Sequence, residues 1–236
     1  MLKKLKISII LSTVIVSFSL FLSCNDAKIA DPPISEIESI FLALGDSYTI
    51  GQSVAVDERW PNQLAEQLTE QSVNIAQPTI IARTGWTTGQ LLTAIQSSAL
   101  SPPYDLVTLL IGVNDQYQGA GINYYRDGFS KLLAKAIELA GNNPQRVIVI
   151  SIPDYSVTPF AQFQDTTAIR QELDLFNNLN RELSDLNNVH YVNITSISRK
   201  AKQDLSYLAP DKLHPSGKMY AEWVDQILPT VLNILK

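Results

Sequence analysis

The sequence predicts an α/β fold in which a parallel sheet of five strands is covered by helices on both faces. Three observations predict it: short apolar runs alternate with helical patterns, 236 residues are enough for one sizeable core, and no internal repeat or low-complexity tract divides the chain. A content of 45% hydrophobic and 17% charged residues is typical of a globular protein. We therefore expect one α/β domain with right-handed crossovers between its strands.

The strand candidates are short, apolar and bounded by turn residues. They comprise residues 40–44, 79–82, 106–111, 146–152 and 190–194. The first run ends at Gly45, after which we expect a loop over residues 48–51 and a helix from about Asp57.

Between the strand candidates, apolar residues recur at helical spacing. Trp60, Leu64 and Leu68 form the first stripe. Further stripes span residues 129–137, 173–183 and 220–231. Pro229 lies within the last stripe and predicts a kink there. We interpret the stripes as the faces by which helices pack on the sheet.

Residues 1–23 predict a signal peptide that is not part of the fold. Lys3, Lys4 and Lys6 precede a nearly unbroken apolar stretch over residues 7–22. That stretch is slightly short for a membrane span, which needs about 20 apolar residues, and it fits a secretory signal better.

Cys24, the only cysteine of the chain, lies at the end of this stretch. The sequence Leu22-Ser23-Cys24 resembles the lipobox of bacterial lipoproteins, in which the cysteine is acylated and becomes the mature N-terminus. A lone cysteine in an exported protein cannot form an internal disulfide, which favours lipidation. Residues 24–38 are then a lipidated tether and residues 39–236 the folded domain of an exported protein, anchored by lipid to a membrane of the bacterial cell envelope. The alternatives are an ordinary secreted protein and an uncleaved anchor.

The charge balance bears on the partners of the protein. The net charge is −5 and no basic run follows the N-terminus, which argues against nucleic acid as a partner. No clustered His and Cys set is present for zinc, so we expect no metal and no organic cofactor. We expect a monomer.

Polar residues follow the strand candidates at the point where a parallel sheet binds its ligands, beyond the carboxyl ends of the strands. These segments are Asp46-Ser47, residues 83–86, 112–115 and 153–155, and, after the fifth run, residues 211–215. Each segment alone is also ordinary turn or helix-capping chemistry.

Ser47 leaves a buried strand where the chain turns, which is how a serine nucleophile is presented. A serine hydroxyl needs a base, and the chain has only two histidines. His214 lies in a polar loop with Asp211 three residues before it, so a carboxylate is available to orient the imidazole. His190 lies inside a strand pattern, and we interpret it as structural.

An attack on an ester carbonyl creates an oxyanion, which needs hydrogen-bond donors. Gly85 offers a backbone N–H, Asn114 offers two side-chain N–H groups, and Ser47 offers its own N–H. We expect Gly45 to let the chain turn and Asp46 to brace the loop.

Together these segments resemble the blocks of the SGNH hydrolases, also called the GDSL esterase/lipase family. The blocks are Gly45-Asp46-Ser47, Gly85, Gly112-x-Asn114-Asp115 and Asp211-x-x-His214, and the resemblance runs from about residue 41 to residue 215. It implies a flavodoxin-like three-layer α/β/α fold. It also implies that Ser47 is the nucleophile, His214 the general base and Asp211 its orienting acid, with Ser47, Gly85 and Asn114 forming the oxyanion hole.

The substrate expected from this resemblance is a carboxylic ester with a short acyl group, including acetylated carbohydrate. Tyr48, Trp86 and Tyr155 are the candidate lining residues, and residues 153–160 resemble a wall of the site in some members. A lysophospholipase, a lipase or a thioesterase of the same family stays open, as does a non-catalytic surface lipoprotein that binds glycan. A classical α/β-hydrolase would need Gly-x-Ser-x-Gly, whereas Ser47 is followed by Tyr48-Thr49.

Overall fold

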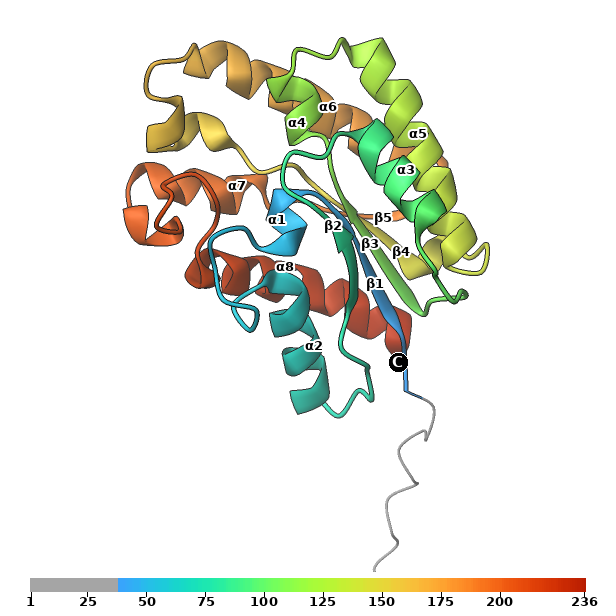
Figure 1. Ribbon diagram of the computed structural model, residues 1–236. Helices are drawn as coiled ribbons and strands as arrows, with labels where there is room; N and C mark the ends of the chain where they lie inside the picture. Colours follow the sequence, from blue (N-terminus) through green and yellow to red (C-terminus); the bar gives the residue numbers. More distant parts are fainter. Residues whose placement is uncertain (1–37) are drawn as a thin grey trace, which may run out of the picture. The chain divides into compact units, whose positions relative to one another are not determined.

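Five parallel strands form the centre of the fold, in the order β2-β1-β3-β4-β5 (Figure 1). The strands of this computed structural model, which describes residues 38–236, are β1 Phe41–Gly45, β2 Thr79–Ala82, β3 Leu106–Leu110, β4 Val147–Ile150 and β5 His190–Val192. The five predicted runs are confirmed as strands, with ends that differ by up to two residues. The predicted signal peptide, Cys24 and the predicted tether up to residue 37 lie outside the described residues.

The strand order is that of the flavodoxin-like fold, which the family resemblance implies. Every residue of β1, β3 and β4 is buried, which explains why these strands read as continuous apolar runs without alternation. After β1 the chain continues to β2 at one edge of the sheet. After β3 it continues to β4 and β5, toward the other edge. The crevice between the ends of β1 and β3 is therefore the place where such sheets bind ligands.

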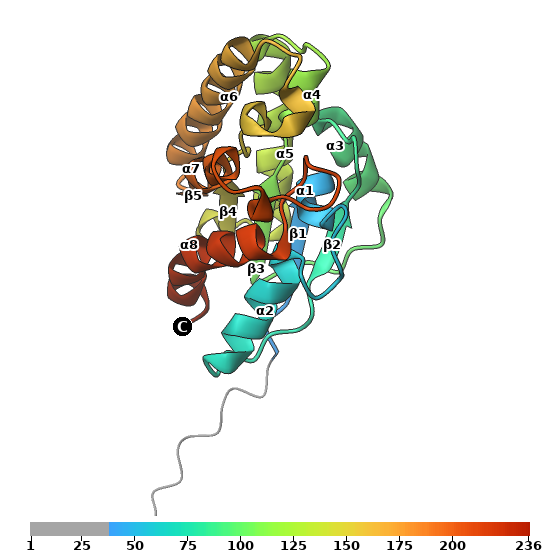
Figure 2. The ribbon, with the colours of Figure 1, turned by 90° about the vertical axis from the view of Figure 1, so that its left-hand side faces the viewer.

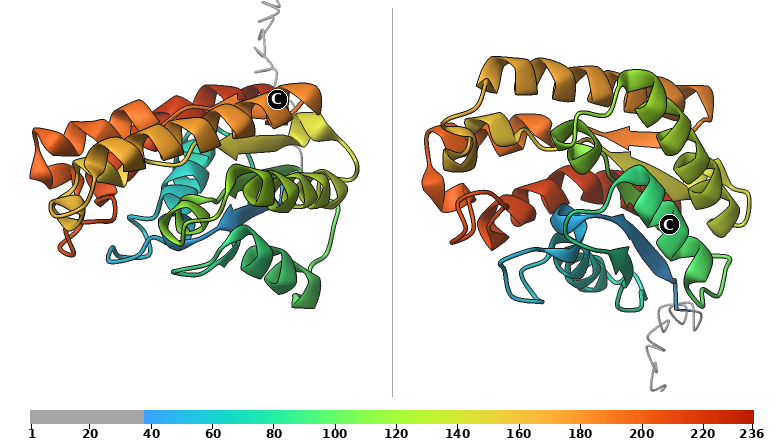
Figure 3. Two further views of the ribbon diagram at one scale, coloured as in Figure 1. Left: turned by 90° about the horizontal axis from the view of Figure 1, so that it is seen from above. Right: turned by 45° about the horizontal axis from the view of Figure 1, so that its top comes forward.

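The long helices cover both faces of the sheet (Figures 2 and 3). One group is α2 Trp60–Glu70 and α8 Gly217–Leu235, which pack on each other; the other is α3 Thr88–Ser97, α5 Ile122–Leu139 and α6 Thr166–Leu186. Shorter elements lie in the connections. These are α1 Ser47–Ile50, α4 Val113–Tyr117, α7 Thr195–Ser198 and the 3-10 turns η1 Pro144–Arg146, η2 Tyr155–Val157, η3 Pro159–Ala161, η4 Arg199–Lys202 and η5 Leu205–Tyr207.

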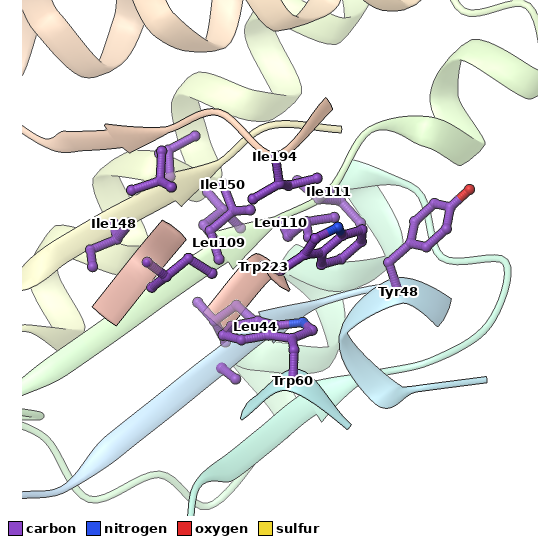
Figure 4. Packing of buried hydrophobic residues seen from close by; sticks show 14 of the residues in the cluster. Leu44, Tyr48, Trp60, Leu109, Leu110, Ile111, Ile148, Ile150, Ile194 and Trp223 are labelled. Carbon is purple, nitrogen blue, oxygen red and sulfur yellow. The ribbon is translucent and has the colours of Figure 1, made fainter. Parts of the chain in front are cut away.

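Two tryptophans are central to the part of the core that packs near the end of β1. Trp60 of α2 and Trp223 of α8 are fully buried and lie close to Leu44 of β1 (Figure 4). Tyr48 continues this cluster toward the carboxyl edge of the sheet, with its ring centroid 6.4 Å from that of Trp223. Packing of large aromatic rings therefore supports the segment that carries Ser47.

Two sequence predictions about local structure are wrong. Residues 47–50 form the short helix α1 and not a loop, because the Asp46 side chain caps it and Gly51 ends it in a left-handed conformation with φ 68°. The next helix begins at Trp60 and not near Asp57, because Arg59 is its N-cap and Pro61 occupies its first turn.

Helix α8 continues through Pro229. The proline removes one backbone hydrogen bond, but Ile227 and Val231 on either side of it are fully buried. Packing of this apolar face holds the helix together across the proline. None of the helices in residues 38–236 combines the length and the hydropathy that a bilayer span requires.

Candidate active site

A cavity of about 160 Å³ lies at the carboxyl edge of the sheet, where the segments that follow β1 to β4 meet the loop before α8. Its walls bring together six of the predicted site residues, Ser47, Tyr48, Gly85, Asn114, Tyr155 and His214. The other lining residues are Thr84, Val113, Tyr117, Phe160 and Leu213.

Ser47 is the first residue of α1, directly after its N-cap. Oδ1 of Asp46 accepts the Tyr48 N–H at 3.0 Å, and the Thr49 and Ile50 N–H groups bond to the Asp46 carbonyl. The Ser47 N–H has no acceptor in the part of the chain that the structure describes. It is therefore free to bind an anionic oxygen at the start of the helix.

Gly45 is required for space and not for a turn, which corrects the sequence prediction. It is the last residue of β1, and a Cβ on it would lie 2.2 Å from Thr49 Oγ1 and 2.5 Å from the Leu110 carbonyl oxygen. The absence of a side chain lets α1 fold back closely against β1 and β3. That close approach places Ser47 at the centre of the sheet edge.

Gly85 is required for its backbone conformation. Its φ is 85°, and a Cβ on it would meet nothing within 4 Å, so the left-handed conformation alone favours glycine. Its N–H has no acceptor among the described residues, since the turn is closed by the Trp86 N–H, which donates to the Arg83 carbonyl at 3.2 Å. A second free backbone N–H therefore lies at the cavity.

Asn114 lies in the first turn of α4, after Gly112. Its Nδ2 donates to the Trp86 carbonyl oxygen at 3.0 Å, so one of the two amide hydrogens is already used and one is left for a ligand. The neighbouring Asp115 accepts hydrogen bonds from the Thr88 N–H at 3.0 Å and the Thr88 hydroxyl at 2.7 Å. These bonds join the segments after β2 and β3 to each other.

The side chains of Asp211 and His214 are in hydrogen-bond contact, as their spacing predicts. Oδ2 of Asp211 lies 2.7 Å from His214 Nδ1, and Oδ1 accepts the backbone N–H groups of Leu213 at 3.0 Å and His214 at 2.9 Å. Partial burial alone would raise the pKa of Asp211, but the hydrogen bonds from Ser53, His214 and the two backbone groups lower it to about 2. The carboxylate is therefore charged over the range in which an imidazole titrates.

The side chains of His214 and Ser47 line the same cavity, and the imidazole contacts the ring of Tyr48 edge to face, with ring centroids 5.6 Å apart. The structure shows no direct hydrogen bond between the Ser47 and His214 side chains in the residues that it describes. Such catalytic contacts are often long without a substrate and shorten when it binds. The Tyr48 carbonyl accepts a hydrogen bond at 3.0 Å from the Tyr220 hydroxyl of α8. This bond ties α1 to α8.

Aromatic side chains form the apolar wall of the cavity. The rings of Tyr117, Tyr155 and Phe160 lie in mutual contact, with centroids 6.0 to 6.2 Å apart. The segment of Tyr155 and Phe160, residues 153–161, is anchored by buried Asp154, which pairs with Arg199 at 2.8 Å and with Arg170 at 3.4 Å. The predicted wall of residues 153–160 thus contributes Tyr155 and Phe160 to the cavity.

Trp86 does not line the cavity, which corrects its predicted position. It packs against the core and lines a separate, shallow hollow together with Gln90, Thr93 and Tyr124. The turn after Gly85 directs the chain to the start of α3. Gly85 therefore lines the cavity, whereas Trp86 lines the separate hollow. His190 begins β5 and so lies at the amino end of a strand, away from the cavity.

Asp46 differs from Asp211 in its environment. It is fully buried, and its Oδ2 has no hydrogen-bond partner among the described residues. Burial raises its pKa to about 8, the negative charge of Asp115 adds to this, and the bond from the Tyr48 N–H offsets part of it. Asp46 is therefore mainly protonated at neutral pH and supports α1 as a neutral cap.

Sequence reasoning missed Ser53 as a site residue. Its hydroxyl donates to Asp211 Oδ2 at 2.6 Å across 158 residues of sequence. No local pattern marks such a contact. The only signal would have been the position of Ser53 just after the segment of the predicted nucleophile Ser47.

The comparisons with known proteins agree with this architecture. The sequence profile of the GDSL-like lipase/acylhydrolase family matches residues 43–222. No curated protein gives a significant match. Among residues 38–236, no group of three or more His, Cys, Asp or Glu side chains is placed to hold a metal ion.

Solved structures share the fold at low sequence identity. The crystal structure of TesA is 14% identical, with a TM-score of 0.65 over 84% of this chain and 100% of that one. The psychrotrophic esterase EstA from Pseudoalteromonas sp. is 16% identical, with a TM-score of 0.64 over 83% and 98%. An acetylxylan esterase from Geobacillus stearothermophilus is 16% identical, with a TM-score of 0.59 over 85% and 96%.

Proposed function

The chain belongs to the GDSL-like lipase/acylhydrolase family, and from this premise we propose that it is a serine esterase that hydrolyses carboxylic esters with short acyl groups. The observation that carries the proposal is the cavity itself. It combines a serine on a helix N-terminus, a histidine bonded to a charged aspartate, and free N–H donors from three separate segments. Each of these is a part that acyl transfer through serine requires.

The mechanism follows from the positions of these groups. His214 accepts the Ser47 hydroxyl proton as the oxygen attacks the ester carbonyl, and Asp211 stabilises the imidazolium that forms. The N–H groups of Ser47 and Gly85 and the remaining amide hydrogen of Asn114 bind the oxyanion. The alcohol leaves with the proton from His214, and water then releases the acid from the acyl-serine by the same route.

The size of the cavity supports a short acyl group. Its volume is about 160 Å³. A buried apolar cavity of about 150 Å³ holds a molecule as large as benzene. An acetyl to butyryl group therefore fits beside Ser47, against the apolar wall that Tyr117, Tyr155 and Phe160 form.

The cavity limits the acyl group of the substrate more than it limits the alcohol group. The separate hollow that begins at Trp86, one residue after Gly85 of the cavity, also carries Tyr124, Gln90 and Thr93, and none of its lining residues is charged. Aromatic faces next to neutral polar groups suit a carbohydrate, and one of the structural neighbours is an acetylxylan esterase. These observations favour an acetylated carbohydrate within the proposed substrate class.

Two measurements test the function. A fluorophosphonate probe should label the wild-type protein and not the Ser47→Ala variant, whereas absence of labelling in the wild type would contradict a serine esterase.

Hydrolysis of p-nitrophenyl esters should be fastest with acetate to butyrate, and acetylated xylan should release acetate. A preference for acyl chains of about eight carbons or more would favour a lipase or lysophospholipase instead, which the exposure of Tyr117 and Phe160 at the rim would accommodate.

We also propose that the protein is exported and anchored by a lipid on Cys24, which rests on the sequence of residues 1–24 alone. Metabolic labelling with an alkyne fatty acid should mark the wild type and not Cys24→Ser. Labelling that survives this substitution would place any lipid elsewhere.

A further inference from the structure

The carboxylate of Asp211 has a hydrogen-bond partner outside its own turn. The Ser53 hydroxyl donates to Oδ2 at 2.6 Å, and this is the same oxygen that lies 2.7 Å from His214 Nδ1. The other oxygen, Oδ1, accepts the Leu213 and His214 N–H groups. Among the bonds to this carboxylate in the described residues, only that of Ser53 therefore ties the acid to another part of the fold.

Ser53 is held by the turn that carries the nucleophile. Gly51 ends α1, and the Gln52 N–H donates to the Ser47 carbonyl at 3.0 Å. Ser53 itself has φ 67°, a left-handed conformation that is unusual for a serine. The chain thus adopts a strained conformation at the residue whose hydroxyl reaches the acid.

The neighbouring residue, Gln52, contacts the segment that follows β2. The Thr84 hydroxyl donates to Gln52 Oε1 at 2.6 Å, and Thr84 directly precedes Gly85. One short segment, residues 47–53, therefore carries Ser47 and contacts both the turn of the oxyanion donor and the acid of the acid–base pair.

We propose that Ser53 is a positioning residue, which holds Asp211 relative to the helix of Ser47 and shares Oδ2 with His214. The proposal rests on the proposed function for its effect on catalysis, but the hydrogen bond has an effect on His214 that can be measured without a substrate. The titratable groups that face His214 are Asp211 on its own turn and the phenol of Tyr48 on α1. The Ser53 hydroxyl directs its hydrogen toward the carboxylate and so reduces the negative charge available to a protonated imidazole.

Removing the hydroxyl has two expected effects on the site. The carboxylate interacts more strongly with the imidazolium, so the titration midpoint of His214 rises. The acid also loses its tie to α1, so the imidazole is held less accurately for proton transfer and kcat falls while KM is unchanged.

The test compares Ser53→Gly with Ser72→Gly. Glycine removes the hydroxyl and accepts the left-handed conformation, so the backbone of residue 53 is not strained by the change. Ser72 is the matched control, because it is exposed, has φ 62° and makes no side-chain hydrogen bond in the residues described. Ser53→Asn tests rescue, since asparagine tolerates this conformation and carries an N–H donor.

The first measurement is an NMR titration of the imidazole protons, which is simple because the chain has two histidines and His190 serves as internal reference. In Ser53→Gly the imidazole signals of His214 should change at a higher pH than in the wild type, with those of His190 unchanged. The second is the pH profile of p-nitrophenyl acetate hydrolysis. In Ser53→Gly, kcat should fall by about 5- to 20-fold, and the acidic limb of the pH profile should move to higher pH.

The outcomes separate the two proposals. An unchanged His214 midpoint in Ser53→Gly overturns the role of Ser53, whatever happens to activity. A fall in kcat that Ser72→Gly reproduces, or that comes with a lower melting temperature and no change in midpoint, also overturns it. A raised midpoint in a protein that hydrolyses no ester supports the contact and refutes the proposed function.

Discussion

Asn114 donates one side-chain amide hydrogen to the Trp86 carbonyl oxygen, 3.0 Å away. Trp86 directly follows Gly85, so this bond sets the distance between two of the proposed oxyanion donors, which lie after different strands. The same bond decides which way the second amide hydrogen points. On the proposed function, Asn114 therefore both donates to the substrate and holds together the segments after β2 and β3.

Substituting Asn114 should lower the rate of the chemical step. Asn114→Ala removes one oxyanion donor and should lower kcat by about 10²–10³, with little change in KM. Asn114→Asp should lower it at least as far, because a carboxylate cannot donate to the Trp86 carbonyl or to an oxyanion. Steady-state kinetics with p-nitrophenyl acetate checks both, and a loss below about threefold in Asn114→Ala would remove Asn114 from the oxyanion hole.

Substituting the nucleophile or the base should abolish nearly all activity. Ser47→Ala and His214→Ala should each lower kcat by about 10⁶, and the double variant should be no worse, because the residues act as a unit. His190→Ala is the control, since His190 lies at the amino end of β5. Near-normal hydrolysis by either active-site variant would disprove the assignment.

Gly45→Ala should destabilise the fold. The added Cβ would lie 2.5 Å from the backbone oxygen of Leu110, which cannot move without disturbing β3, so a loss of about 1–3 kcal/mol in the free energy of unfolding is expected. Gly89→Ala is the matched control, because its Cβ meets nothing within 4 Å and alanine favours the helix. Urea denaturation measures both, and equal stability of the two variants would show that β1 and α1 do not need this close approach.

Burial of Asp46 predicts how stability depends on pH. Its pKa is about 8 in the fold against an ordinary value of 3.8, so the folded protein holds this proton more tightly than the unfolded chain. Its contribution to stability is present below about pH 4 and is lost as the pH rises toward 8, with a slope of up to about 1.4 kcal/mol per pH unit.

Asp46→Asn should remove this dependence, because the amide oxygen can still accept the Tyr48 N–H but cannot ionise. Asp165→Asn is the control, since Asp165 also caps a helix but is exposed. The midpoints of urea denaturation of the wild type and both variants, measured at pH 5 and pH 8, test this prediction. If the wild type and Asp46→Asn lose the same stability between these values, Asp46 does not hold the proton.

The parts of the structure that sequence could predict are those with a local cause. The strands are recognisable because each is a short apolar run buried in a parallel sheet, and Asp211 and His214 because three residues on one turn bring them together. Helix α1 has four residues, too few for any periodic pattern, and it depends on a capping side chain and a left-handed glycine.

The remaining features depend on contacts between distant segments. The need for glycine at position 45 comes from the carbonyl of Leu110 on another strand, and Ser53 reaches Asp211 only in the folded chain. The placement of Trp86 outside the cavity follows from how the turn after Gly85 enters α3. None of these relations leaves a mark in the neighbouring sequence.

The bond from the Tyr220 hydroxyl to the Tyr48 carbonyl joins residues 172 positions apart. During synthesis, the segment with Ser47 leaves the ribosome long before His214 and the helix α8 that supports it. A nascent chain therefore contains Ser47 before His214 and before the helix that bonds to its segment. On the proposed function, esterase activity therefore requires that nearly the whole chain has been synthesised.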